Sequence, residues 1–220
     1  MRSEERFMDT LKYILDKFNL KFDDTTKMPI EIRDFDRESM ATLFNELGFE
    51  IGVEVGVRDG GYSFILCREI PGLKLYGVDP YEVHEGYLDH TLQSSLDKFE
   101  KIAREKLAPY PNYEFIKKYS SDAIKDFKDE SLDFVYIDGD HSFWSVAFDI
   151  ERWGKKVRKG GIISGDDYFN HKGPSRIHVY QAVKGYTDAW RIKPWFIVGS
   201  QEIVPGEKRD HGRSWLWVKK

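Results

Sequence analysis

From about residue 50 onward, short runs rich in β-branched and aromatic residues alternate with longer stretches of helical periodicity. This alternation is typical of βαβ units, in which each helix connects two neighbouring parallel strands. The β-rich runs are residues 51–55, 75–78, 113–116, 132–137 and 161–164. The helical stretches between them are residues 62–70, 92–107, 122–127 and 142–153. We therefore predict an α/β protein built on a parallel sheet.

The C-terminal part of the chain breaks this pattern. After a further helical stretch at residues 179–186, two β-rich runs at residues 195–198 and 215–218 are separated by a polar loop that contains Gly206 and Gly212. The spacing indicates an antiparallel pair at the edge of the sheet, whereas a symmetric dinucleotide-binding domain would continue with another parallel strand and crossover. The predicted fold is a Rossmann-like three-layer sandwich with a mostly parallel seven-stranded sheet and an antiparallel C-terminal strand pair.

Two amphipathic helical patterns, the second over residues 40–47, precede the first predicted strand. Gly48 follows the second pattern, at a position where a glycine in the left-handed conformation commonly ends a helix. Residues 21–37, between the two patterns, are expected to form a connecting loop. We treat residues 1–48 as an N-terminal helical extension that serves as a lid or as a substrate or dimer contact, and residues 49–220 as the main domain.

The composition limits the classes of function. With 220 residues, 40% hydrophobic and 33% charged, the chain fits one α/β domain with a modest extension. No apolar run approaches the roughly 18 residues that a membrane span needs, and the net charge of −4 does not predict nucleic-acid binding. The first residues lack a secretory signal pattern, so we expect a cytoplasmic protein. Cys67, the single cysteine, is expected to be a packed thiol, and apolar positions on the N-terminal helices are suited to a homo-oligomer contact.

The segment at residues 54–63 has the sequence EVGVRDGGYS and ends the first strand of the α/β region. A strand that ends in a carboxylate and is followed by glycines and a helix start places a small charged ligand at its carboxyl end. Gly56, Gly60 and Gly61 lie at offsets of zero, four and five, whereas a pyrophosphate-binding fingerprint requires offsets of zero, two and five. Glu54 would repel a pyrophosphate and attract the ammonium group of a cofactor that contains an amino acid.

Two further segments are candidates for nucleotide contacts. Asp79 ends the next strand, where an acidic residue can accept hydrogen bonds from ribose hydroxyls. Followed by Pro80, it could instead initiate a turn. Ser121 and Asp122 follow the third strand and could orient an adenine ring, or they could cap a short helix.

Three segments resemble the class I S-adenosylmethionine (SAM)-dependent methyltransferases: EVGVRDGGYS at residues 54–63, YGVD at residues 76–79 and DFVYIDGDH at residues 133–141. The resemblance covers residues 49–199 and includes small-molecule O-methyltransferases of the macrocin type and, more distantly, of the catechol O-methyltransferase type. It implies that residues 49–220 bind SAM and methylate a hydroxyl of a small molecule, such as a sugar or a secondary metabolite. The N-terminal extension has no counterpart in this resemblance.

The resemblance also implies roles for individual residues. The loop from Glu54 to Gly60 would hold the methionine end of SAM, Asp79 the ribose, and the segment around Ser121 and Asp122 the adenine. The residues implied at the cofactor are Glu54, Gly56, Arg58, Gly60, Ser63, Asp79, Ser121, Asp122 and Asp138.

Acidic residues follow the next two strands of the predicted sheet. Asp138 comes after residues 132–137, and Asp166 and Asp167 come shortly after residues 161–164. Because parallel neighbours end at the same edge, we expect these three carboxylates to converge, and a bound cation would relieve their repulsion. Oxygen ligands favour Mg²⁺, Ca²⁺ or Mn²⁺ over zinc. In the O-methyltransferases that the chain resembles, Mg²⁺ held at these strand ends binds the acceptor oxygens; the alternative is a polar loop without a metal.

A general base is needed if the metal does not suffice to remove the acceptor proton. His141 and His171 lie on loops at the same edge, and the ordinary pKa of histidine, about 6.5, suits proton removal near neutral pH. His141 sits at a helix start, where capping is a competing role, so we favour His171. Asp138 is the third candidate catalytic residue.

Two alternatives belong to other classes of protein. An NAD-dependent oxidoreductase is disfavoured by the glycine offsets and by the C-terminal strand pair. A cofactor-binding partner subunit without a catalytic duty is disfavoured by the presence of Asp138, Asp166 and Asp167 together.

Overall fold

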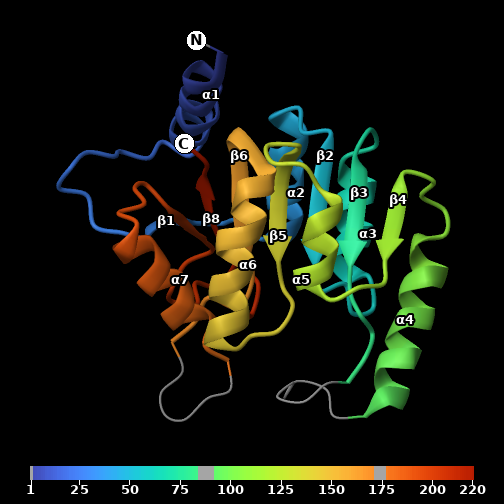
Figure 1. Cartoon of the computed structure of the whole chain (residues 1–220). Coiled ribbons are helices and arrows are strands. Elements are labelled where there is room, and N and C mark those ends of the chain that lie inside the picture. Colours follow the sequence, from blue (N-terminus) through green and yellow to red (C-terminus); the bar gives the residue numbers. More distant parts are fainter. Residues whose placement is uncertain (1, 84–91, 171–176) are drawn as a thin grey trace.

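The computed structural model of the protein describes residues 2–83, 92–170 and 177–220, with side chains described from residue 9 onward. These residues form an eight-stranded sheet with helices on both faces (Figure 1). The strands are β1 (Ile30–Ile32), β2 (Ile51–Val55), β3 (Lys74–Val78), β4 (Tyr113–Ile116), β5 (Leu132–Ile137), β6 (Val157–Gly165), β7 (Phe196–Val198) and β8 (Trp215–Val218). The helices are α1 (Arg2–Lys17), α2 (Arg37–Glu46), α3 (Gly61–Glu69), α4 (Gln93–Leu107), α5 (Ser120–Ala123), the 3-10 turn η1 (Ile124–Asp126), α6 (Phe143–Lys156) and α7 (Val179–Ala189).

The strand order is β1-β7-β8-β6-β5-β2-β3-β4. Neighbouring strands run parallel except at β8, which lies antiparallel between β6 and β7. The predicted antiparallel pairing of the last two β-rich runs is confirmed, with Phe196 opposite Leu216, but the pair does not form the edge of the sheet as predicted, because β1 pairs with β7 beyond it. The Rossmann-like α/β class with a mostly parallel sheet is therefore confirmed as well.

The sheet has one strand more than the seven predicted. β1 forms where the sequence predicts a connecting loop over residues 21–37, and it pairs parallel with β7, so that Ile30 lies beside Phe196 and Ile32 beside Val198. A strand of three residues is too short for its alternation to be recognised. Its partner strand lies near the other end of the chain, and no local pattern announces that pairing.

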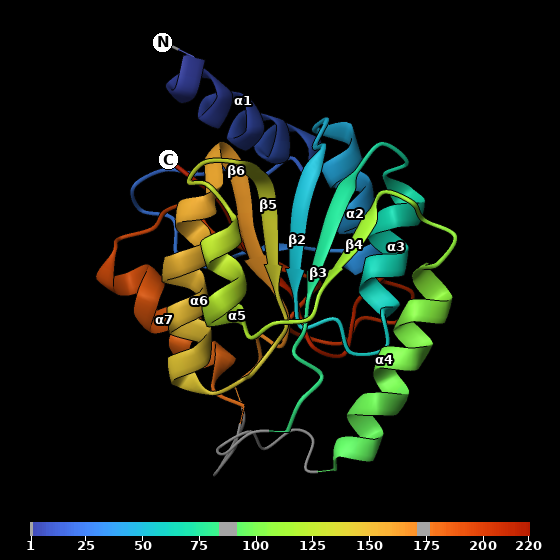
Figure 2. The same ribbon diagram turned by 45° about the vertical axis from the view of Figure 1, so that its right-hand side comes forward.

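Side chains of the central strands alternate between two cores, as the period of two in a strand requires. Phe134 and Tyr136 of β5 pack on the side of α1, α2 and α3, where Cys67 is also buried, whereas Val135 and Ile137 pack on the side of α6 and α7. Figure 2 shows the sheet between these helical layers. Within the described ranges, no helix is both long and apolar enough to cross a lipid bilayer.

The N-terminal elements pack into the same core as the sheet. Ile14 of α1 and Phe44 of α2 are fully buried, and the ring of Phe44 lies 4.6 Å from the ring of Phe134 on β5. The hydroxyl of Thr10 donates to the carbonyl of Gly160 on β6 at 2.8 Å. Burial of this apolar surface makes α1 and α2 a source of stability for the sheet. Their roles as a lid, a substrate contact or a dimer contact stay predictions.

Ile14→Ala is expected to lower the free energy of unfolding by about 2–5 kcal/mol, because it leaves a cavity beneath α1 that the surroundings fill only in part. Lys12→Ala, on the exposed face of the same helix, is the control and should change the stability by less than about 0.5 kcal/mol. Chemical denaturation followed by circular dichroism measures both changes. An Ile14→Ala protein as stable as the control would contradict the integral packing of α1.

Candidate active site

A cleft of about 760 Å³ opens at the carboxyl ends of β2, β3, β5 and β6. In open α/β sheets this is the edge at which ligands bind. Figure 2 shows the arrowheads of β2, β3 and β5 ending together at this edge. The start of α2 and the loop between β7 and β8 also contribute to its lining. The cleft therefore collects residues from segments that are far apart in the sequence.

The loop after β2 comes very close to the loop after β5. The N–H of Asp138 donates to the carbonyl of Val55 at 2.7 Å. Gly56 has a φ of +90°, and a Cβ added there would lie 2.1 Å from the carbonyl oxygen of Asp138, so only glycine fits. Gly60, with a φ of +73°, directly precedes α3. Of these two predicted cofactor residues, Gly56 lines the cleft and Gly60 does not.

Asp79 holds the loop after β2 in place. One of its carboxylate oxygens accepts hydrogen bonds from the N–H groups of Val57 and Arg58, both at 3.0 Å, and the other accepts from the N–H of Tyr81 at 2.8 Å. Burial raises the pKa of Asp79, and these three hydrogen bonds oppose the rise. Asp79 and Arg58 both line the cleft. The contact of Asp79 with a ribose stays a prediction.

Glu54 is a buried carboxylate at the end of β2, with 1% of its surface exposed. The hydroxyl of Ser63 on α3 donates a short hydrogen bond to it and lies 3.2 Å from the hydroxyl of Tyr113. Burial raises the pKa of Glu54 to about 8; the hydrogen bond from Ser63 opposes this rise, and the charge of Asp138 adds to it. Glu54 lines the cleft, whereas Ser63 lies outside the lining and supports Glu54 from α3.

The two residues predicted to border an adenine ring differ in their positions. Ser121 lines the cleft. Asp122 is exposed outside the lining, and its carboxylate pairs with Nζ of Lys125 at 2.7 Å. Neither residue caps α5, whose N-cap is Tyr119 and has no side-chain capping hydrogen bond. The capping alternative is therefore wrong, and contact with adenine stays a prediction.

Asp149 of α6 lines the cleft and is not singled out by the sequence analysis. It is 4% exposed and accepts a hydrogen bond from the hydroxyl of Ser120, which itself accepts one from Nε1 of Trp153 at 2.8 Å. Burial raises the pKa of Asp149 to about 7, against the effect of the Ser120 hydrogen bond. A lone acid on the apolar face of an amphipathic helix is the signal that could have revealed it.

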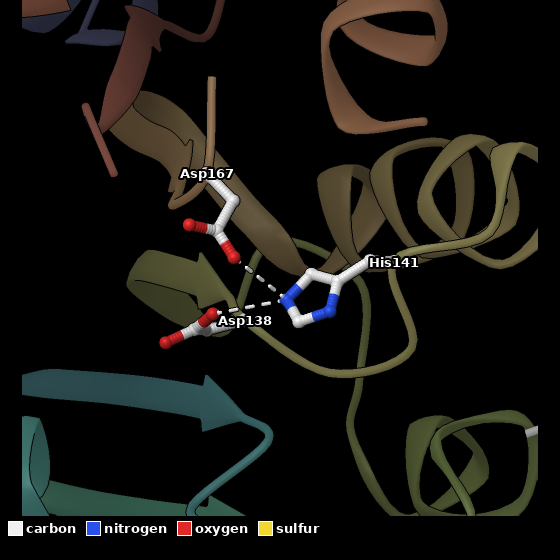
Figure 3. Close-up of side chains that lie close together, drawn as sticks. All are labelled: Asp138, His141 and Asp167. Atoms are coloured by element: carbon white, nitrogen blue, oxygen red, sulfur yellow. Dashed lines mark hydrogen bonds and ion pairs between the residues drawn. The ribbon is translucent and has the colours of Figure 1, made fainter. Parts of the chain in front are cut away.

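Asp138, His141 and Asp167 meet in the cleft (Figure 3). Nε2 of His141 lies 3.5 Å from Oδ1 of Asp138 and 3.1 Å from Oδ2 of Asp167. One possible ligand atom from each residue lies within 4.8 Å of the other two. Asp138 and Asp167 converge as the strand ends predict, and the histidine joins them from the loop before α6. Two carboxylates and an imidazole form a donor set that fits a divalent cation.

Asp166, the third predicted metal ligand, has a different partner. Nη1 of Arg37 donates to its Oδ2 at 2.9 Å and lies 3.9 Å from Oδ2 of Asp138. Burial raises the pKa of Asp166 to about 8, an effect that Asp138 strengthens and Arg37 opposes. The structure therefore groups Asp138 and Asp167 with a histidine, and pairs Asp166 with an arginine.

Arg37 and the loop between β7 and β8 complete the cleft, and neither is among the residues predicted from the sequence. Arg37 begins α2. Its main-chain N–H donates to Oδ2 of Asp210 at 2.7 Å, and its side-chain Nε lies 3.6 Å from Oδ1 of the same carboxylate. His211 and Gly212 also line the cleft, and a Cβ on Gly212 would lie 2.1 Å from Oδ1 of Asp167. Contacts between residues so distant in the sequence leave no local pattern.

Residues 53–168 match a sequence family described as a methyltransferase domain, and the match covers more than half of the chain. The chain belongs to this methyltransferase family. The methyltransferase is also 30% identical, over 124 residues, to a protein of Acanthamoeba polyphaga mimivirus; the alignment covers 54% of this chain and 52% of the viral protein. The chain thus spans about half the length of the curated relative that it matches.

Two solved O-methyltransferases share the fold of this methyltransferase. The enzyme from Bacillus cereus, in complex with S-adenosylhomocysteine (SAH), has a TM-score of 0.58 at 18% identity, with 98% of this chain and 91% of that chain covered. TomG from Streptomyces achromogenes, involved in tomaymycin synthesis and in complex with SAM, has a TM-score of 0.58 at 15% identity, with 98% and 90% covered. The likeness shows the class I SAM-dependent methyltransferase fold.

Among the described residues, the histidines that line the cleft of the methyltransferase are His141 and His211. His171, which the sequence analysis favours as the base, lies outside the described residues. His141 faces two carboxylates, whereas the ring of His211 lies 6.1 Å from the ring of Phe169 in an edge-on contact. The identity of the base stays a prediction, and His211 joins its candidates.

Asp149→Asn is expected to make the stability of the methyltransferase less dependent on pH. In the folded protein Asp149 keeps its proton up to about pH 7, whereas in the unfolded chain it loses the proton near about pH 4. The contribution of this group to stability is therefore lost as the pH rises through that window. The variant should lose less stability over the window, by up to about 1.4 kcal/mol per pH unit.

Urea denaturation at several pH values between about 4 and 7 measures this difference in slope. Asp122→Asn is the matched control, since Asp122 is exposed and pairs with a surface lysine; it should keep the wild-type slope in this window. Equal slopes in all three proteins would contradict the raised pKa of Asp149.

Proposed function

We propose that the protein transfers the methyl group of SAM to a hydroxyl group of a small molecule. The observation behind this proposal is a single cleft in which the buried carboxylate of Glu54 faces the same space as the cluster of Asp138, His141 and Asp167. The first group suits the cofactor, and the cluster suits the acceptor.

Glu54 is suited to the ammonium group of SAM. Its carboxylate is buried and its pKa is raised, so a cation bound beside it would compensate for the lost hydration of its charged form. The carboxylate of Asp79 keeps one lone pair, on Oδ1, beyond its three amide hydrogen bonds, and a ribose hydroxyl can use it. Ser121 borders the space for adenine. The SAH and SAM complexes of the two fold relatives support this choice of cofactor.

A buried polar atom in the cleft is consistent with a bound polar molecule. Tyr62 of α3 lines the cleft, and its hydroxyl is buried without a hydrogen-bond partner among the described residues. Buried hydroxyls in folded proteins are nearly always hydrogen-bonded. A polar atom of the cofactor or the acceptor would satisfy this group.

Asp138, His141 and Asp167 would hold a divalent cation at the acceptor end of the cleft. Their carboxylates suit Mg²⁺ and Mn²⁺, and the imidazole nitrogen favours Mn²⁺ or another transition metal over Mg²⁺. When bound, such a cation lowers the pKa of the acceptor hydroxyl and orients its oxygen.

In the proposed reaction the acceptor oxygen attacks the methyl carbon of SAM in line with the sulfur. The oxygen–carbon bond forms as the carbon–sulfur bond breaks, the bonding electron pair goes to sulfur, and SAH leaves. The hydroxyl proton passes to a base, for which His141, His211 and Asp138 line the cleft and His171 stays a candidate from the sequence. Holding both reactants in one cleft supplies the orientation that this displacement needs.

The two alternatives are less well supported. An oxidoreductase would have to place the pyrophosphate of NAD beside Glu54, and membership of a methyltransferase family gives that function no support. A non-catalytic subunit would have no use for the converging side chains of Asp138, His141 and Asp167.

Glu54→Gln is expected to weaken SAH binding roughly ten- to hundredfold, because a hydrogen bond from an ammonium group to a carboxylate contributes about 1.5–3 kcal/mol. Isothermal titration calorimetry with SAH measures the change. Glu114→Gln is the matched control: it removes one carboxylate that pairs with Lys74 on the surface, outside the cleft lining, and should leave the affinity unchanged.

The unmodified protein tests the proposed function in the same experiment. It should bind SAH but not NADH, and it should convert SAM to SAH when an acceptor with a free hydroxyl is present, as mass spectrometry of the product shows. Binding of NADH without binding of SAH would overturn the proposal. SAH binding without turnover on a broad panel of hydroxyl acceptors would favour the non-catalytic subunit.

A further inference from the structure

Arg37 lies at the acceptor end of the cleft, beside the carboxylates of Asp138 and Asp166. Its Nη1 donates to Oδ2 of Asp166 at 2.9 Å and lies 3.9 Å from Oδ2 of Asp138. The side chain of Asp166 is 8% exposed and that of Arg37 32%, so the pair is shielded from most of the solvent. A guanidinium group keeps its charge in proteins at any ordinary pH. A permanent positive charge therefore occupies part of the space between these two carboxylates.

Several contacts fix Arg37 in this position. Its N–H donates to Asp210 at 2.7 Å, its Nε lies 3.6 Å from the same carboxylate, and its guanidinium lies 5.7 Å from the ring centre of Tyr62, within the range of a cation–π contact. The start of α2 is fixed as well, because the N-cap Asp36 accepts a hydrogen bond from the N–H of Ser39 at 2.8 Å. Both the main chain and the guanidinium of Arg37 are thus held in place.

We propose that Arg37 is a built-in cation that keeps Asp166 out of the metal-ligand set and so limits the affinity of the acceptor end for a divalent ion. The use of this site in methyl transfer rests on the proposed function, whereas the binding of a metal ion there does not. While Asp166 is paired with Arg37, the donors left are Asp138, His141 and Asp167. The guanidinium also repels a second cation beside Asp138.

Removal of Arg37 would act on the metal site in two ways. Oδ1 of Asp166 would keep its hydrogen bond from the hydroxyl of Ser214 at 3.3 Å, but Oδ2, which Arg37 now holds, would be released and could serve as a fourth ligand. The local positive charge would also be gone. The affinity of a site for a divalent ion rises with the number of charged ligands, and both changes therefore favour the metal.

The test measures Mn²⁺ binding from the electron paramagnetic resonance of the free ion, without SAM or acceptor. Arg37→Met and Arg37→Gln both remove the charge and keep the main-chain N–H at the start of α2. Each should bind Mn²⁺ tighter than the wild type by roughly tenfold or more, because one charged ligand is added and one cation is lost. Arg68→Met removes an arginine that pairs with Glu38 and Glu69 on the surface, and it should leave the affinity unchanged.

A second comparison leaves Arg37 in place. Asp166→Asn should weaken Mn²⁺ binding less than Asp167→Asn does, because Asp166 is paired with Arg37 and is not a ligand. The double variant Arg37→Met with Asp166→Asn should lose the gain that Arg37→Met shows on its own. This reversal distinguishes recruitment of Asp166 from a general loss of positive charge.

Three outcomes would overturn the proposal: folded Arg37 variants that bind Mn²⁺ no tighter than the wild type, an Asp166→Asn protein as weak as Asp167→Asn, or no Mn²⁺ binding by any of the proteins. Thermal unfolding identifies the folded variants. If neither Arg37 variant folds, the comparison of Asp166→Asn with Asp167→Asn decides. SAH binding by the same samples tests the proposed function separately, since Mn²⁺ binding is measured without SAH.

Discussion

The contact between the loop after β2 and the loop after β5 is the constraint on which the cleft depends. Because Gly56 has no Cβ, its main chain lies directly against that of Asp138, whose N–H donates to the carbonyl of Val55. This approach puts the carboxylate of Glu54 on one side of the junction and the carboxylate of Asp138 on the other, within one cleft. Any side chain at position 56 would push the ends of β2 and β5 apart. The proposed cofactor site and the proposed acceptor site would then also move apart.

The same junction brings negative charges together, and the fold offsets them from distant elements. At the acceptor end, burial raises the pKa of Asp166, and repulsion between its carboxylate and that of Asp138 adds to the rise. Arg37 from α2 lies between these two acids and relieves part of the repulsion. The groups that would make the site reactive thus work against the stability of the folded chain, a conflict that is common at functional sites.

The parts of the fold that follow local patterns are predictable from the sequence. Strands β2, β4, β5 and β8 begin and end at the predicted residues, because polar or glycine-containing turns bound their β-rich runs. Topology alone also places Glu54, Asp79 and Asp138 at one edge of the sheet. Side-chain orientation is not predictable in this way: Asp122 lies in the predicted segment but turns to a surface lysine. The place of Arg37 in the cleft is not predictable either, because its partners are distant in the sequence.

The acceptor end of the cleft is built from widely separated segments, and this has a consequence for biosynthesis. Arg37 leaves the ribosome early and Asp166 much later, and Asp210 follows only after β7. β8 then inserts between β6 and β7. Without β8, β7 and β1 would lack the strand that joins them to β6. A copy truncated before Ser214 would keep most of the residues that line the cleft but would lack Ser214 and Trp215, which donate hydrogen bonds to Asp166.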